Sequence, residues 1–125
     1  MFSIIIPCYN GEKTIIRCLE SIVNQTSDKY EIIIINDGST DKSQELINNF
    51  ILNNQTIDIT LKNIDNNGHG AARNLGVSLA KHDYIWFVDA DDFIFSEKHY
   101  TELEDAARDI KQNNYPDIYI FSVFE

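Results

Sequence analysis

Two runs of consecutive isoleucines constrain the fold of this chain more than any other feature. One is Ser3–Ile6 and the other is Glu31–Ile35. β-branched residues favour extended backbone, and an apolar run without polar alternation is typical of a strand buried on both faces. Between the runs, apolar residues recur at helical spacing (Ile15, Ile16, Leu19, Ile22 and Val23). Strand, helix and strand in this order predict a βαβ unit.

The same alternation continues and predicts one α/β domain with a mostly parallel sheet. Pro7 is expected to end the first strand, because it has no backbone N–H for the ladder. Ile57–Leu61 alternates apolar and polar residues and fits a half-exposed edge strand, whereas Tyr84–Val88 is apolar throughout. A last strand is expected over Asp117–Val123, after Pro116. The other helices are expected to bury Leu46, Ile47, Phe50 and Ile51; Ala72, Leu75, Gly76, Leu79 and Ala80; and, after a cap at Ser96, Leu103, Ala106, Ala107 and Ile110.

The predicted strand order identifies one edge of the sheet as the ligand site. Right-handed crossovers with Ile57–Leu61 at an edge favour the order third, second, first, fourth. The order then reverses between the first strand and Tyr84–Val88, and open α/β sheets bind ligands at such a point. Ser39 or Thr40 is expected to cap the second helix, with Asp41 in its first turn.

Three carboxylates follow the Tyr84–Val88 strand. In extended backbone, residues two apart point the same way, so Asp89 and Asp91 are expected to face one crevice and Asp92 to turn aside. Mg²⁺ or Mn²⁺ usually binds one or two carboxylates together with substrate phosphates and water. The alternative is that Asp91 and Asp92 are loop acids that cap the next helix.

Other candidate residues lie at the same edge. Asp37 would contact a base or ribose, or serve only as an Asx-turn residue. Tyr9 would offer a stacking face for a base, or be a partly buried turn aromatic. Arg73 is expected in the first turn of its helix, where the dipole disfavours a cation, so a ligand is the better reason for it. The histidines lack partners at ligand spacing and are expected on the surface (His69, His82 and His99).

Composition narrows the partners and the compartment. The 125 residues suit one domain, and the net charge of -10 argues against nucleic acid or an anionic lipid surface as a partner. An acidic protein that binds an anionic nucleotide needs a metal between the like charges. Cys8 and Cys18 fit no metal or redox spacing and are expected to be buried thiols. No transmembrane segment or signal peptide is apparent, which favours the cytoplasm, with peripheral association at the inner face of the membrane left open. The oligomeric state stays open.

Other enzymes of doubly wound folds fit less well. A dinucleotide dehydrogenase needs Gly-x-Gly-x-x-Gly after the first strand, where Pro7–Glu12 stands, and Gly11–Thr14 is not a P-loop. A phosphatase with an Asp-x-Asp nucleophile would carry it on the first strand.

Four motifs resemble the nucleotide-binding half of the family 2 glycosyltransferases. They are Ser3–Asn10, Ile35–Asp41, Gly70–Gly76 and Phe87–Asp92, in the order and spacing of that family. The family consists of inverting enzymes with the GT-A fold, a Rossmann-like, doubly wound, mostly parallel sheet with helices on both faces.

The resemblance implies a nucleotide-sugar donor, often a UDP-sugar, and a divalent cation, Mn²⁺ or Mg²⁺. By position Tyr9 would stack on the base, Asp37 would bind its edge and Arg73 would reach it from the other side. Asp89 would lie against the ribose and sugar, and Asp91 would ligate the metal, with Asp89 as a second ligand. Pro7, Asn10 and Ala90 complete the implied nucleotide-binding set. The acceptor would be a hydroxyl of a carbohydrate or lipid-linked molecule, in the synthesis of a cell-surface polysaccharide or glycoconjugate.

The general base of that family lies beyond the Asp-x-Asp motif, in the acceptor half. Residues 1–125 are therefore expected to form the nucleotide-sugar-binding part of a GT-A domain, truncated before that half, with no catalytic base in this chain. The carboxylates of the following helix are expected to be solvated (Glu97, Glu102, Glu104 and Asp105). The alternative is a nucleotide- and metal-binding fragment that does not catalyse.

Overall fold

A computed structural model describes residues 2–24, 30–94 and 102–114, except for the side chains of 102–106. The strands in it are β1 (Phe2–Cys8), β2 (Tyr30–Asp37), β3 (Ile59–Ile64) and β4 (Tyr84–Phe87). The helices are α1 (Ile15–Val23), α2 (Ser43–Leu52), α3 (His69–Leu79) and α4 (Glu102–Gln112). The strands form one sheet in the order β3-β2-β1-β4, and every pairing is parallel. The predicted α/β class and strand order are confirmed.

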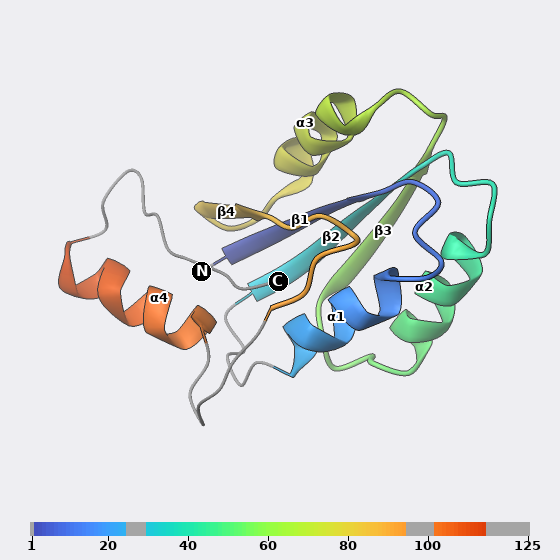
Figure 1. The fold of residues 1–125 in the computed structure, drawn as a ribbon. Coiled ribbons are helices and arrows are strands. Elements are labelled where there is room, and N and C mark those ends of the chain that lie inside the picture. Colours follow the sequence, from blue (N-terminus) through green and yellow to red (C-terminus); the bar gives the residue numbers. More distant parts are fainter. Residues whose placement is uncertain (1, 25–29, 95–101, 115–125) are drawn as a thin grey trace.

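The isoleucine runs lie in the two central strands and face both layers of helices. Ile4 and Ile34 pack in the core cluster that includes residues of α1 and α2, whereas Ile5 and Ile33 pack with Ala72 of α3. Figure 1 shows α3 on one side of the sheet and α1 and α2 on the other. Because successive strand residues point to opposite faces, only an unbroken apolar run satisfies both layers.

Gly76 allows α3 to approach the sheet closely, as its place inside a helix predicts. A Cβ atom at this position would overlap the side chain of Ile5 in β1. The same helix differs from the prediction at its end, where Leu79 is 39% exposed.

The first strand continues past Pro7, so the predicted end of β1 was wrong. Pro7 pairs with Ile35, and β1 ends at Cys8. The carbonyl of Ile5 accepts a hydrogen bond from the Val88 N–H at 3.0 Å, on the side of β1 that faces β4. Residues two apart in a strand have the same orientation, so the backbone nitrogen of Pro7 also faces this side. Since β4 ends at Phe87, no strand among the described residues requires the N–H that proline lacks.

Two further elements differ from their predicted form. Within the described residues β4 is short and pairs only with β1, and its Phe87 is 45% exposed rather than buried. Neither Ser39 nor Thr40 caps α2, which begins at Ser43 after Lys42. The predicted cap at Ser96 and the predicted strand Asp117–Val123 lie outside the described residues. Among the described helices, none has the length and apolar character that crossing a bilayer requires.

Candidate functional site

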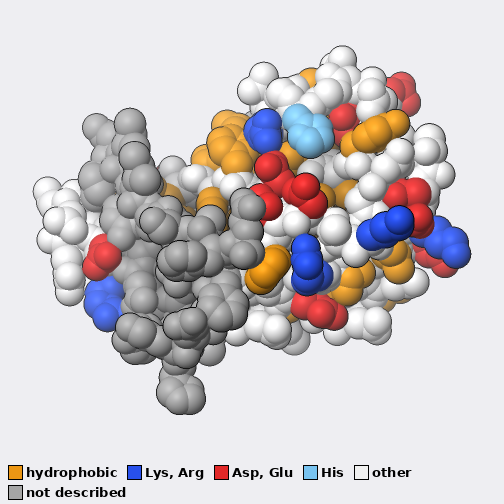
Figure 2. Space-filling model, viewed as in Figure 1, with side chains coloured by type: hydrophobic (Ala, Val, Ile, Leu, Met, Phe, Trp, Pro, Cys, Tyr) orange, Lys and Arg blue, Asp and Glu red, His pale blue; other side chains and the backbone are white. Residues whose placement is uncertain are grey.

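An open cleft of about 660 Å³ lies at the carboxyl ends of β1 and β4. The predicted residues Pro7, Tyr9, Asn10, Asp89, Ala90 and Asp91 all line it, and so do Gly11, Glu12, Lys13, Thr14, Asp41 and His69. Figure 2 shows acidic side chains gathered near the middle of this face, with basic side chains above and below them. The sheet reverses its strand order at this point, as predicted.

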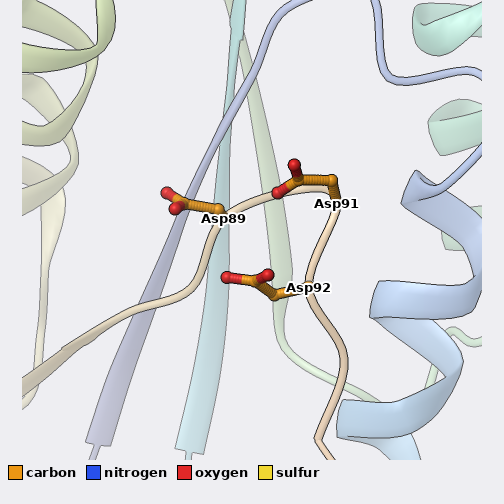
Figure 3. A group of neighbouring side chains, drawn as sticks. All are labelled: Asp89, Asp91 and Asp92. Carbon is orange, nitrogen blue, oxygen red and sulfur yellow. The ribbon is translucent and has the colours of Figure 1, made fainter. Parts of the chain in front are cut away.

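Asp89, Asp91 and Asp92 form a single acidic cluster, called that below. The Asp92 N–H donates to the Asp89 carbonyl at 3.0 Å, so this segment is a turn and not extended backbone. One carboxylate oxygen of each residue lies within 4.8 Å of the others (Figure 3). The cleft lining includes Asp89 and Asp91 but not Asp92, in agreement with the prediction. Because a turn breaks the two-residue alternation, one oxygen of Asp92 nevertheless stays close to the other two carboxylates.

Arg73 reaches the acidic cluster from α3, which lies on the face of the sheet opposite α1 and α2. Its Nη2 lies 2.9 Å from Oδ1 of Asp89, and the two side chains are 36% and 46% exposed. Because α3 begins at His69, Arg73 lies in its second turn rather than its first, and the dipole argument for a ligand is weaker than expected. Arg73 does not line the cleft itself.

Asp37 is buried and does not line the cleft. Its Oδ1 accepts the Asn67 N–H at 2.8 Å and its Oδ2 accepts the Gly68 N–H at 3.0 Å. The side chain of Asn66 donates to the Asp37 carbonyl at 3.1 Å. Asp37 thus ties β2 to the loop before α3, and its contact with a base stays a prediction.

Asn10 joins the loop after β1 to the loop after β2. It adopts a φ of 50°, its N–H donates to Ser39 Oγ at 2.9 Å, and its Oδ1 accepts the Thr40 N–H at 2.8 Å. Tyr9 next to it is 46% exposed on the cleft. These hydrogen bonds of Asn10 therefore hold the backbone next to Tyr9, whose ring lies on the cleft.

A second set of bonds joins the same two loops. The Gly11 N–H donates to Ser43 Oγ at 2.9 Å, and the Glu12 N–H donates to Asp41 Oδ2 at 3.1 Å. Burial acts to raise the pKa of Asp41, but hydrogen bonds from Ser43 and Glu12 outweigh it and leave that pKa below its usual value. Asp41 is thus an ionised acceptor in the wall of the cleft.

The cysteines lie behind the acidic cluster and are both buried and free, as predicted. Burial first, and then the charges of Asp92, Cys8, Asp91 and Asp89, raise the pKa of Cys18 to about 12. A thiol in that state stays protonated at neutral pH and is no ligand for a cation.

Arg17 supports the turn from α1. Its Nη2 donates to the Asp91 carbonyl at 3.3 Å, and its guanidinium carbon lies 4.7 Å from the centre of the Phe93 ring. The contact holds the backbone of the acidic cluster while the Asp91 side chain stays exposed.

The sequence analysis missed several residues of the cleft. His69 was expected on the surface and is exposed, and it also lines the cleft at the start of α3. Its position after the third strand was the available signal, since the carboxyl ends of parallel strands share one edge. Glu12, Lys13 and Thr14 carried no comparable signal, because their place depends on the path of the loop.

Comparisons with known proteins agree with this geometry. The model of the family described as "Glycosyl transferase family 2" matches residues 3–123. A poly(ribitol-phosphate) beta-glucosyltransferase of Bacillus spizizenii is 44% identical over 97 residues, which are 76% of this chain and 15% of that protein. Glycosyltransferase GlyG of Streptococcus pneumoniae is 34% identical over 118 residues, which are 92% of this chain and 39% of that protein.

Solved structures give the same result. That of S. aureus TarS 1-349 has a TM-score of 0.78 and 30% identity, and the match covers 89% of this chain and 32% of that one. The TarS structures in complex with UDP and with UDP-GlcNAc also match with a TM-score of 0.78. The chain thus spans well under half the length of these relatives. The GT-A fold that the resemblance implied is confirmed. Because the family model extends over almost the whole described sheet and its cleft, the chain belongs to glycosyl transferase family 2.

Proposed function

We propose that this chain binds a nucleoside diphosphate sugar, a UDP-sugar, together with a divalent cation. The observation that carries the proposal is the acidic cluster at a cleft that also presents the exposed ring of Tyr9. A carboxylate group next to a stacking surface suits a ligand with a charged diphosphate at one end and a flat base at the other.

The acidic cluster fits a hard divalent cation by its chemistry. All of its donors are carboxylate oxygens, which Mg²⁺ and Mn²⁺ prefer, and Asp91 is exposed on the cleft. Asp91 and Asp89 would hold the ion, with Asp92 near enough to take part. When bound, such a cation neutralises charge on the departing diphosphate.

The remaining residues would bind the nucleotide. Tyr9 stacks on the base, while Pro7 and Asn10 shape the backbone below it. Asp89 and Ala90 lie against the ribose and sugar. The TarS complexes with UDP and UDP-GlcNAc support a uridine donor, because the similarity to TarS covers 89% of this chain.

In the whole protein, we propose an inverting transfer to an acceptor of a cell-surface polysaccharide or glycoconjugate. The acceptor hydroxyl attacks the anomeric carbon opposite the diphosphate, the bond to the diphosphate oxygen breaks, and the hydroxyl proton passes to a base. The base belongs to the acceptor half and not to the cleft described here. The relative that uses poly(ribitol-phosphate) supports a cell-surface acceptor. The location stays cytoplasmic in this proposal.

A thermal shift experiment tests the donor site. UDP with Mn²⁺ should raise the melting temperature of the chain more than either alone, since a ligand at about 100 times its Kd stabilises by about 2.7 kcal/mol. Asp91→Asn should remove the Mn²⁺-dependent part of the shift. Asp83→Asn, an exposed site at the amino end of β4, should leave it unchanged. A parent chain that no nucleoside diphosphate stabilises, with or without Mn²⁺, would sink the proposal.

A further inference from the structure

The ion pair between Arg73 and Asp89 occupies part of the proposed cation site. Nη2 of Arg73 lies 2.9 Å from Oδ1 of Asp89, and the Asp89 carboxylate is one of the three that offer an oxygen to the acidic cluster. The pair joins α3 to the turn after β4. An arginine therefore lies against one of the three carboxylates of the acidic cluster.

This pair contributes little to folding but changes the charge of the acidic cluster. Both side chains are more than one-third exposed, and ion pairs at such positions contribute little to folding. Three carboxylates with oxygens within 4.8 Å of one another repel each other, and the guanidinium offsets one of their charges. It also lies on Oδ1 of Asp89, one of the two oxygens that this carboxylate offers to a cation.

We propose that Arg73 is a positioning residue that holds Asp89 and keeps the acidic cluster from binding a divalent cation strongly before the nucleotide arrives. This inference rests on the proposed cation site. A cation that takes Asp89 displaces the guanidinium, which is then free to contact the anionic nucleotide. Nucleotide and cation thereby strengthen each other's binding, and by linkage the two effects are equal.

Titration of the nucleotide-free chain with Mn²⁺, followed by the electron paramagnetic resonance signal of the free ion, tests the inference. Arg73→Gln should bind Mn²⁺ about fivefold more tightly than the parent, because a positive charge and a competitor for Asp89 are both lost. Arg73→Met, which keeps an apolar stem, should do the same, and Arg73→Lys should fall between. UDP should strengthen Mn²⁺ binding by a smaller factor in Arg73→Gln than in the parent.

Lys62→Gln is the matched control, because it makes the same change in net charge on the exposed edge strand β3. It should leave the Mn²⁺ affinity unchanged. Equal or weaker Mn²⁺ binding in both Arg73→Gln and Arg73→Met, with the parent binding Mn²⁺ and UDP, would overturn the inference alone. An absence of Mn²⁺ binding in every protein, even with UDP, would overturn the proposed cation site and the inference with it.

Discussion

Asp37 and Asp89 both follow a strand at the same edge of the sheet, but their surroundings differ. Asp37 is 1% exposed and accepts two backbone N–H groups, whereas the Asp89 side chain is 46% exposed and faces the guanidinium of Arg73. The sequence placed both carboxylates correctly, because the strand ends were predictable. It did not reveal their partners, since Asn67 and Arg73 come from segments whose path is set by tertiary packing.

Asp37→Asn should lower the free energy of unfolding by about 1–3 kcal/mol, because an amide has only one acceptor oxygen for the two N–H groups. Urea denaturation measures the loss, and Asp65→Asn at an exposed loop position should cost nothing measurable. If Asp37→Asn also binds UDP and other nucleoside diphosphates with the parent's selectivity, Asp37 supports the loop without contacting the base. Unchanged stability would contradict the role given to its two hydrogen bonds.

At the scale of elements, hydrophobic periodicity predicted which segments are strands and helices but not how they end. It predicted the positions of α1, β1 and β2, because the buried face of a helix or strand is visible in the spacing of its apolar residues. It failed at Pro7, where the absence of β4 beyond Phe87 decides the outcome, and at Asp89–Asp92, where a turn replaces extended backbone. Such ends depend on neighbouring elements, which no local pattern contains.

Gly76 sets the distance between α3 and the sheet. Gly76→Ala should destabilise the chain by about 1–3 kcal/mol, because the added methyl group overlaps Ile5 in a packed layer. Gly70 lies in the same helix with no atom within 4 Å of its added Cβ, so Gly70→Ala should be neutral or stabilise by up to about 1 kcal/mol. Thermal or urea unfolding of both variants checks the contrast, and equal effects would rule out the close approach as its cause.

Considered as a whole, the molecule has a different polar group at each end of its sheet. The cleft lies at the carboxyl ends, while Glu31, 1% exposed, lies toward the amino ends. Its Oε1 accepts bonds from Ser3 Oγ and the Lys81 N–H, each at 2.6 Å, and its Oε2 lies 3.6 Å from Lys81 Nζ. The strand order was predictable from handedness and edge character, but a buried acid inside an isoleucine strand was not assigned a partner.

Glu31→Ala should lower the free energy of unfolding by about 3 kcal/mol, because it leaves Ser3 and the Lys81 backbone without their acceptor. Binding of UDP with Mn²⁺ should persist below the melting temperature, since the two sites lie at opposite ends of the strands. Calorimetry measures both quantities. A large loss of ligand affinity in the folded variant would mean that the two ends are coupled.

The pairing of β1 with β4 has a kinetic consequence. Phe2 pairs with Tyr84, so one edge of β1 stays unpaired until β4, the last strand of the described sheet in sequence, has been synthesised. Contacts this distant in sequence form slowly, and a nascent chain presents the open Phe2–Ile5 edge until that strand leaves the ribosome. The acidic cluster follows β4 directly, so the cleft is completed only when this edge is closed.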